Sequence, residues 1–305
     1  MHSEVVSDRL GSCPKCGMTL VSSNEKRKAV AHEAENFLEV PGARLYYETH
    51  GSGPVLLVIP GASGSGEGFK RVTEYLAVHY TVVTYDRRGF SRSQLDGPQD
   101  YDHRLETETD DVRLLIERVS DEPVIVFGVS SGAIIALEVL ARHPSVVRTL
   151  ISHEPPAVRL LADGQKWIDF FSEIYSLYRE SGMDSALKKF REHAFAELDR
   201  QAMGRAPKNE YTLTNATYWF ERELRQYPAV DLNLDVLKAH ADRILLTAGR
   251  ESRGYPCYEA TVELTKRFGS NLIELPGGHV GLLTQPAEFG REFLQALRMD
   301  RKEIE

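Results

Sequence analysis

The sequence predicts an α/β fold with a mostly parallel sheet that carries helices on both faces. Strand-like apolar runs alternate along the chain with stretches whose apolar residues recur at helical spacing, as in repeated βα units. The runs at 54–59 and 123–127 are apolar throughout, which is typical of strands covered on both faces. A chain of 305 residues, 42% of them hydrophobic, is long enough to bury a core without disulfide bonds.

The first two predicted strands form a hairpin, because FLEV and ARLYYET alternate in polarity on either side of Pro41-Gly42. Later strands are predicted at 54–59, 81–86, 123–127, 146–152, 243–249 and 271–275. Helices are predicted where apolar residues recur at helical spacing, at 68–79, 105–119, 132–143, 259–269 and 286–298. Their order along the chain is what predicts the parallel sheet.

Residues 155–241 interrupt this alternation with helical, aromatic-rich sequence. The block fits a helical cap inserted over one end of the sheet. Most of its aromatic side chains are expected to pack the cap onto the body, although they would also suit an apolar acyl or aromatic substrate. These residues are Trp167, Phe170, Phe171, Tyr175, Tyr178, Tyr211, Tyr218, Trp219 and Phe220.

Composition excludes several classes of partner. The formal net charge of -8, from 37 basic and 45 acidic residues, argues against a nucleic-acid surface. No apolar run reaches the roughly 18–20 residues of a membrane span, and the N-terminus has no apolar signal-peptide core. We therefore expect a soluble, cytoplasmic protein that acts on a small molecule and has neither nucleic acid nor membrane as a partner.

A candidate nucleophile lies in the sequence GVSSG at 128–132, between a predicted strand and a predicted helix. In the pattern G-x-S-x-G the glycines permit a sharp turn, so the middle side chain projects from the carboxyl end of the sheet. That residue is Ser130. The backbone N–H of Ser131, at the start of the helix, points toward a developing oxyanion.

A serine hydroxyl needs a base, and His279 in LPGGHVGLL is the candidate, because its loop leaves the sheet at the same edge. A second oxyanion donor is expected from the glycine-rich loop after the strand at 54–59, where Ala62 N–H is the candidate. This loop matches neither the phosphate-binding pattern G-x-x-x-x-G-K-[ST] nor a clean G-x-G-x-x-G, which argues against nucleotide binding.

Residues from about 36 to 300 resemble the α/β-hydrolase fold family in the order and spacing of IPGA, YDRRGFSRS, GVSSGA and GGHV. The resemblance implies that Ser130 is the nucleophile and His279 the base. It implies no cofactor for catalysis. Asp86 and Arg88 in YDRRGFSRS are expected to be structural, fixing their loop by local ion pairs.

The acid that completes the site is less well defined by this resemblance. The family usually places it three residues past the glycine of RILLTAG, where this chain has Ser252. Glu251, one residue earlier, is the preferred substitute. Some members instead take the acid after the strand that follows the nucleophile helix, where this chain has Glu154. Both glutamates preserve the chain order serine, acid, histidine.

The first 22 residues resemble a short heavy-metal-binding domain, through Met1-His2 and the run CPKCGM that contains Cys13, Cys16 and Met18. Such a segment would bind Zn²⁺ or Cu⁺ through Cys13, Cys16 and His2, with methionine thioethers as further ligands for Cu⁺. A remnant that binds no metal is the alternative. We expect this segment at 1–22, a linker at 23–35 and one hydrolase domain at 36–300.

The predicted activity is hydrolysis of a small acyl ester, or a related carbonyl compound, through an acyl-enzyme intermediate. A serine at 130 argues against the branches that attack through an aspartate, the haloalkane dehalogenases and epoxide hydrolases. It leaves thioesterases, lactonases, C–C bond hydrolases and perhydrolases open. Two alternatives are a non-catalytic small-molecule receptor on the same fold and a protein whose metal-binding segment matters most.

Overall fold

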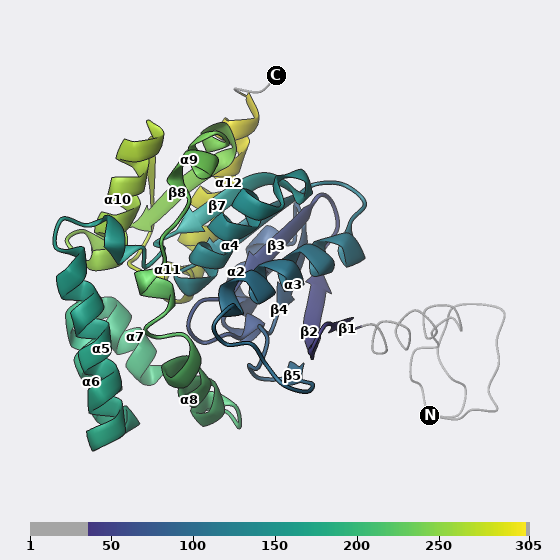
Figure 1. The fold of residues 1–305 in the computed structure, drawn as a ribbon. Coiled ribbons are helices and arrows are strands. Elements are labelled where there is room, and N and C mark those ends of the chain that lie inside the picture. Colours follow the sequence, from purple (N-terminus) through teal and green to yellow (C-terminus); the bar gives the residue numbers. More distant parts are fainter. Residues whose placement is uncertain (1–35, 303–305) are drawn as a thin grey trace, which may run out of the picture.

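A computed structural model of the chain describes residues 36–302, which are built around one twisted sheet (Figure 1). Within this part of the chain the strand order is β1-β2-β4-β3-β6-β7-β8-β9, with the short β5 beside β2. The strands are β1 (Phe37–Val40), β2 (Ala43–His50), β3 (Val55–Ile59), β4 (Thr81–Tyr85), β5 (Gln94–Leu95), β6 (Val124–Val129), β7 (Val147–His153), β8 (Ile244–Gly249) and β9 (Leu272–Leu275). From β4 to β9 neighbouring strands are parallel, whereas β1, β2 and β5 are antiparallel additions.

Helices cover both faces of this sheet, as the sequence predicts. On one face the apolar side chains of α3 (Arg104–Val119), α4 (Ser131–Arg142) and α10 (Pro256–Phe268) form one core cluster with the sheet. On the other face α2 (Lys70–Leu76) and α12 (Pro286–Lys302) form a second cluster. Because β6 is buried along its whole length, its carboxyl end is a rigid base for the turn that follows.

The cap enters between β7 and β8, where the sequence places it. It consists of α5 (Gly164–Ser181), α6 (Met183–Ala194), α7 (Glu197–Arg205) and α8 (Thr212–Arg222). These helices extend beyond one end of the sheet in Figure 1. All the predicted aromatic residues except Tyr211 join one core cluster, in which Phe171, Trp219 and Phe220 are buried and which also contains Phe90 of the body. The cap is therefore a packed unit rather than a loose flap.

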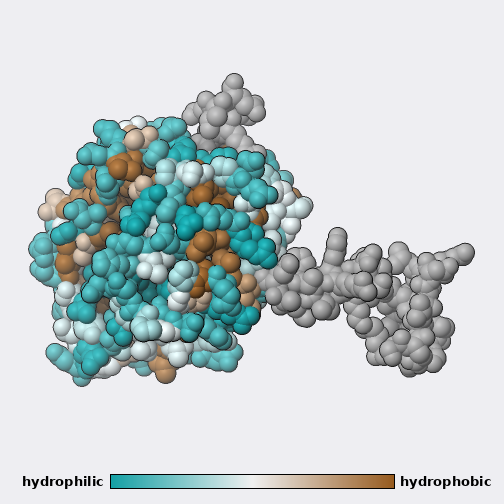
Figure 2. Space-filling model, turned by 45° about the vertical axis from the view of Figure 1, so that its right-hand side comes forward, coloured by the Kyte–Doolittle hydropathy of each residue, from teal (hydrophilic) through white to brown (hydrophobic). Residues whose placement is uncertain are grey.

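The last part of the predicted block differs from the prediction. Helix α9 (Leu234–Lys238) packs its Leu237 into the core of the body, not into the core of the cap. The surface seen in Figure 2 is mainly hydrophilic with short apolar strips between polar residues. Among the described helices none is long and apolar enough to cross a bilayer.

Candidate active site

The turn between β6 and α4 holds Ser130 in a strained backbone conformation, with φ 54° and ψ −123°. Such a conformation costs a non-glycine residue on the order of 1–3 kcal/mol and persists only where the surroundings enforce it. A Cβ on Gly128 would lie 2.4 Å from the carbonyl oxygen of Gly132, and one on Gly132 would lie 2.2 Å from that of Ile59. Both glycines of the G-x-S-x-G pattern are therefore required by packing.

The turn is also tied to the next strand, because the N–H of Ser130 donates to the carbonyl oxygen of His153 at 2.9 Å. His153 is the last residue of β7, and Glu154 follows it directly. The backbone of the candidate nucleophile is thus fixed one residue away from a candidate acid.

The side chain of His279 is paired with Glu154. Its Nδ1 lies 2.6 Å from Oε2 of Glu154, and the two side chains are 5% and 1% exposed. The other carboxylate oxygen accepts the N–H of Gly249 at 2.8 Å. Burial tends to raise the pKa of Glu154, but the hydrogen bond and charge of His279, with the N–H of Gly249, hold that pKa below its usual value. The carboxylate is therefore ionised at neutral pH.

Glu154 reaches His279 because its own backbone turns at a φ of 47°. Its N–H donates to the carbonyl oxygen of Thr247 at 3.1 Å, which closes the loop onto β8. With the carboxylate ionised, Nδ1 of His279 carries the proton and Nε2 is left as the base.

The two candidate glutamates differ in their contacts with His279. The side chain of Glu251 is exposed, and its carboxylate accepts a hydrogen bond from Gln285 at 3.3 Å. Its backbone N–H binds the carbonyl oxygen of Gly277, in the loop before His279. Glu251 therefore helps to close that loop, whereas Glu154 holds the imidazole.

A cap residue, Asp199 of α7, also holds the histidine loop. Its carboxylate accepts the backbone N–H of His279 at 2.9 Å and that of Val280 at 3.1 Å. The side chain is fully buried, and burial raises the pKa of Asp199 against the opposing effect of His279 and the two N–H groups. Phe195 packs on the imidazole with ring centroids 4.8 Å apart. Cap and histidine are therefore in direct contact.

The glycine-rich loop after β3 passes directly over the serine turn. A Cβ on Gly61 would lie 3.0 Å from Cβ of Ser130, so the backbone at Ala62 comes close to the nucleophile. Ser131 is the first residue of α4, where a backbone N–H has no partner within the helix. The structure thus brings both predicted oxyanion donors to the same end of the sheet as Ser130.

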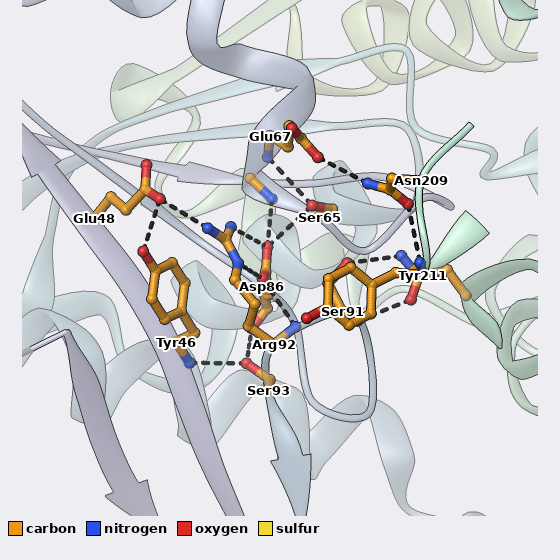
Figure 3. Close-up of polar contacts among 12 residues, drawn as sticks. Tyr46, Glu48, Ser65, Glu67, Asp86, Ser91, Arg92, Ser93, Asn209 and Tyr211 are labelled. Carbon is orange, nitrogen blue, oxygen red and sulfur yellow. Dashed lines mark hydrogen bonds and ion pairs between the residues drawn. The ribbon is translucent and has the colours of Figure 1, made fainter. Parts of the chain in front are cut away.

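Asp86 anchors the far end of this loop. It accepts hydrogen bonds from Oγ of Ser65 at 3.1 Å and from the N–H of Gly66 at 2.9 Å, and it pairs with Arg92 (Figure 3). Arg88 instead makes a two-pronged pair with Asp111, at 2.8 and 2.7 Å. Asp86 thus has the expected ion pair within its loop, whereas the partner of Arg88 lies in α3, 23 residues further along the chain.

Sequence reasoning missed two contributors to this region. Asp199 lies in an ordinary polar stretch of the cap, and no pattern marks it. Arg87, the other arginine of YDRRGFSRS, is fully buried and bound to Glu108 and Glu223, each at 2.6 Å. The doubled arginine between a strand and a glycine was the available signal.

The predicted metal ligands His2, Cys13 and Cys16 lie outside the described residues. Within residues 36–302, no group of three or more His, Cys, Asp or Glu side chains could hold a metal ion. Cys257 lies in the first turn of α10, where burial raises the pKa of its thiol well above the usual value.

Comparison with known families gives two matches. The model of the alpha/beta hydrolase fold matches residues 54–286, and that of the heavy metal binding domain matches residues 1–22. Among curated proteins, the uncharacterized hydrolase YraK of Bacillus subtilis (strain 168) is 34% identical over 270 residues, which are 87% of this chain and 96% of that protein. The zearalenone hydrolase of Bionectria ochroleuca is 30% identical over 122 residues, 38% of this chain and 44% of that protein.

Solved structures agree on the fold. The enol-lactonase from Burkholderia xenovorans LB400 superimposes with a TM-score of 0.67 at 17% identity, over 86% of this chain and 99% of that one. A thermophilic esterase from Thermogutta terrifontis gives a TM-score of 0.68 at 18% identity, over 87% and 97%. At this level of identity the likeness concerns the fold alone.

Proposed function

Because the chain belongs to the α/β-hydrolase fold family, and is a hydrolase by that membership, we propose that it cleaves small acyl esters by serine catalysis. The observation that carries the proposal is the buried His279–Glu154 pair, 2.6 Å long, at the sheet edge where Ser130 is held in a strained turn. An ionised carboxylate on Nδ1 leaves Nε2 free to accept the proton of a serine hydroxyl.

In the proposed reaction, Oγ of Ser130 attacks the acyl carbon while Nε2 of His279 takes its proton. Glu154 stabilises the imidazolium that forms, without itself becoming protonated. The imidazolium then protonates the leaving alkoxide, and the acyl group stays on Ser130. A water molecule, deprotonated by the same histidine, releases the acid and restores the serine.

The negative oxygen of each tetrahedral intermediate would bind the N–H groups of Ala62 and Ser131. Loss of one such donor costs about 10²–10³-fold in kcat in a well-studied serine protease. Both loops are fixed before substrate arrives, through Asp86 on one side and β6 on the other, so little reorganisation is required.

The substrate class follows from the cap and from the relatives' names. Helices α5, α6 and α8 present an aromatic core beside the site, which suits an apolar acyl group or an aromatic leaving group. A lactone is the cyclic form of the same chemistry, and two proteins similar to this chain are named as an enol-lactonase and an esterase.

We test this proposal by labelling the purified protein with a fluorophosphonate, followed by peptide mass spectrometry. The expected result is one label on Ser130, which is lost in Ser130→Ala and slowed by orders of magnitude in His279→Ala. Absence of label from a folded wild-type protein would favour a non-catalytic small-molecule receptor and overturn the proposal.

For residues 1–22, which match the heavy metal binding domain, we propose that Cys13, Cys16 and His2 bind one Zn²⁺ or Cu⁺ ion. Two thiolates and an imidazole are ligands for both ions. The test is the metal content of protein dialysed against each ion. Cys13→Ser/Cys16→Ser should lose the bound metal while Ser130 labels at the wild-type rate, and equal metal content in both proteins would contradict the assignment.

A further inference from the structure

Arg87 contacts the glycine-rich loop that carries the candidate oxyanion donor Ala62, yet the proposed reaction assigns Arg87 no role. Its guanidinium is fully buried. Nη1 donates to the carbonyl oxygen of Gly61 at 2.9 Å and approaches that of Pro60 at 3.4 Å. A fixed cation therefore lies on the peptide unit that contains the N–H of Ala62.

The contact between Arg87 and the carbonyl of Gly61 fixes the direction of the N–H of Ala62. The carbonyl of Gly61 and the N–H of Ala62 belong to one planar trans peptide, so they point in opposite directions. When Arg87 holds the carbonyl, the N–H must point away from Arg87. Gly61 lies against Ser130, where an added Cβ would be 3.0 Å from the serine Cβ. A positive donor on the carbonyl also polarises the peptide and strengthens its N–H as a donor.

The carbonyl of Ser63, two residues further along the loop, is held by the cap. Nδ2 of Asn215, in α8, donates to the carbonyl oxygen of Ser63 at 3.1 Å and to Oγ of Ser91 at 2.8 Å. The Oδ1 atom of Asn215 accepts the backbone N–H of Ser91 at 2.8 Å. Ala62 thus lies between two carbonyls, each bound by a buried or half-buried side chain.

Arg87 is itself positioned by carboxylates from two parts of the fold. Nη2 binds Oε2 of Glu108 in α3 and Oε2 of Glu223, directly after α8, each at 2.6 Å. Arg104 contacts both glutamates, at 2.5 Å and 3.8 Å. Two arginines thus face two glutamates and the cluster is neutral. A buried cluster of this kind adds little net stability compared with an apolar core, but it defines where Arg87 lies.

We infer that Arg87 is a positioning residue for the oxyanion hole, and that Glu223 and Asn215 couple its alignment to the seating of cap helix α8 on the body. This inference rests on the proposed serine chemistry. It also gives the cap a second role, because helix α8, which packs in the cap core, would also orient the loop that stabilises the oxyanion.

The neighbouring Arg88 supplies a matched control. It is buried and paired with Asp111, but its remaining contacts are the carbonyl of Pro41 and the side chain of Gln99. The test compares Arg87→Met/Glu223→Gln, which leaves Arg104 and Glu108 as a neutral pair, with Arg88→Met/Asp111→Asn. Each variant replaces one buried arginine and one buried carboxylate that pairs with it, but only the first touches the oxyanion loop.

The measurements are kcat and KM on p-nitrophenyl butyrate, the inhibition constant of a trifluoromethyl ketone and the pH profile of kcat/KM. We expect the Arg87 variant to lose about 10- to 100-fold in kcat, less than complete removal of an oxyanion donor. The ketone, which forms a tetrahedral oxyanion on the serine, should bind weaker by a similar factor. KM and the pH profile should stay close to wild type. The Arg88 variant should keep kcat within about threefold.

Unchanged kcat and ketone affinity in a folded Arg87 variant would overturn the inference, as would equal losses in the Arg88 control. If the double variant does not fold, Glu223→Gln and Asn215→Ala replace it, and wild-type kcat in both has the same meaning. Failure of wild-type Ser130 to react with a fluorophosphonate would overturn the proposed function and this inference together. Normal wild-type labelling with no effect at Arg87 would overturn the inference alone.

Discussion

The loops after β7 and β8 leave the same edge of the sheet from neighbouring parallel strands, and each carries a glutamate. Glu154 follows β7 immediately, with a φ of 47° that turns its carboxylate into the protein. Glu251 lies in a single turn of 3-10 helix after β8, and its side chain is exposed. The difference teaches that the direction of the backbone at the strand end, not the distance along the chain, selects the partner of the histidine.

The environments of the two carboxylates differ accordingly. Glu154 is 1% exposed, so its charge is stable only because His279 and the N–H of Gly249 bind it. The carboxylate of Glu251 accepts one long hydrogen bond from Gln285 at the solvent-exposed surface. Interactions of exposed charges contribute little to stability. Removing the negative charge should therefore be costly in the first loop and nearly silent in the second.

The largest loss of activity is expected on substitution of the candidate nucleophile, Ser130. Ser130→Ala should lower kcat/KM on p-nitrophenyl butyrate by at least about 10³-fold, since removal of a serine nucleophile costs roughly 10⁶-fold in kcat in a related chemistry. The midpoint of thermal unfolding should be unchanged or slightly higher, because alanine keeps the Cβ in the turn and removes only the hydroxyl group. Residual activity above a tenth of wild type would remove Ser130 from the mechanism.

The next effect separates the two loops directly. Glu154→Gln should lower kcat by about 10²–10⁴-fold, because glutamine cannot stabilise the imidazolium and favours the wrong tautomer. Glu251→Gln should keep kcat within about threefold, as expected for an exposed substitution. Steady-state kinetics on one ester measures both. Comparable losses in the two variants would contradict the difference drawn between the loops.

Acid should lower the stability of the folded protein through His153, the residue before Glu154. Burial lowers the pKa of His153 to about 4. The charge of Glu154 opposes this decrease, whereas the charge of His279 adds to it. The unfolded state, with a histidine pKa of about 6.5, binds more protons between these two values. Stability is therefore complete above about pH 6.5 and falls, by about 3 kcal/mol in total, as the pH approaches 4.

Denaturant unfolding between pH 7 and pH 4 measures this loss. His153→Gln keeps a polar group near Thr247 Oγ1, which lies 3.0 Å from Nδ1 of His153, but removes the titration. The variant should be the less stable protein at pH 7 and should show a flatter dependence on pH. Equal slopes in the two proteins would mean that His153 titrates normally.

A smaller effect than that of Glu154→Gln is expected at the cap residue that holds the histidine loop. Asp199→Asn keeps an acceptor for one of the two N–H groups but removes a buried negative charge beside His279. The imidazolium that forms during the reaction loses stabilisation, and its loop loses part of its anchor. The maximal rate should therefore fall about three- to tenfold. A kcat equal to that of wild type would leave Asp199 as a purely structural contact.

Most of the fold could be read from the sequence because periodicity reports burial. The apolar run around Val126 became a fully buried central strand, and the aromatic block became the cap core. The short strand β5 was missed, because two exposed residues, Gln94 and Leu95, carry no periodic signal. The end of the 155–241 block was assigned to the cap, whereas its Leu237 packs into the core of the body, since an amphipathic helix does not reveal which apolar surface it meets.

The parts of the candidate site that a local motif defines could be predicted from the sequence. The parts that depend on contacts between distant residues could not. The glycines around Ser130 encode its turn, and the glycines before His279 encode its loop. The positive φ of Glu154 leaves no such mark, because glutamate rarely adopts it. Asp199 and Arg87 act across 80 and 26 residues of sequence, on His279 and Gly61, and only the folded chain brings them to the site.

The most direct test of the account is the rate at which Ser130 reacts with a fluorophosphonate in Glu154→Gln and Glu251→Gln, measured side by side with wild type. This rate reports activation of the nucleophile without knowledge of the natural substrate. The account predicts a wild-type rate in Glu251→Gln and a rate lower by two or more orders of magnitude in Glu154→Gln. A fast Glu154→Gln protein beside a slow Glu251→Gln protein would contradict it.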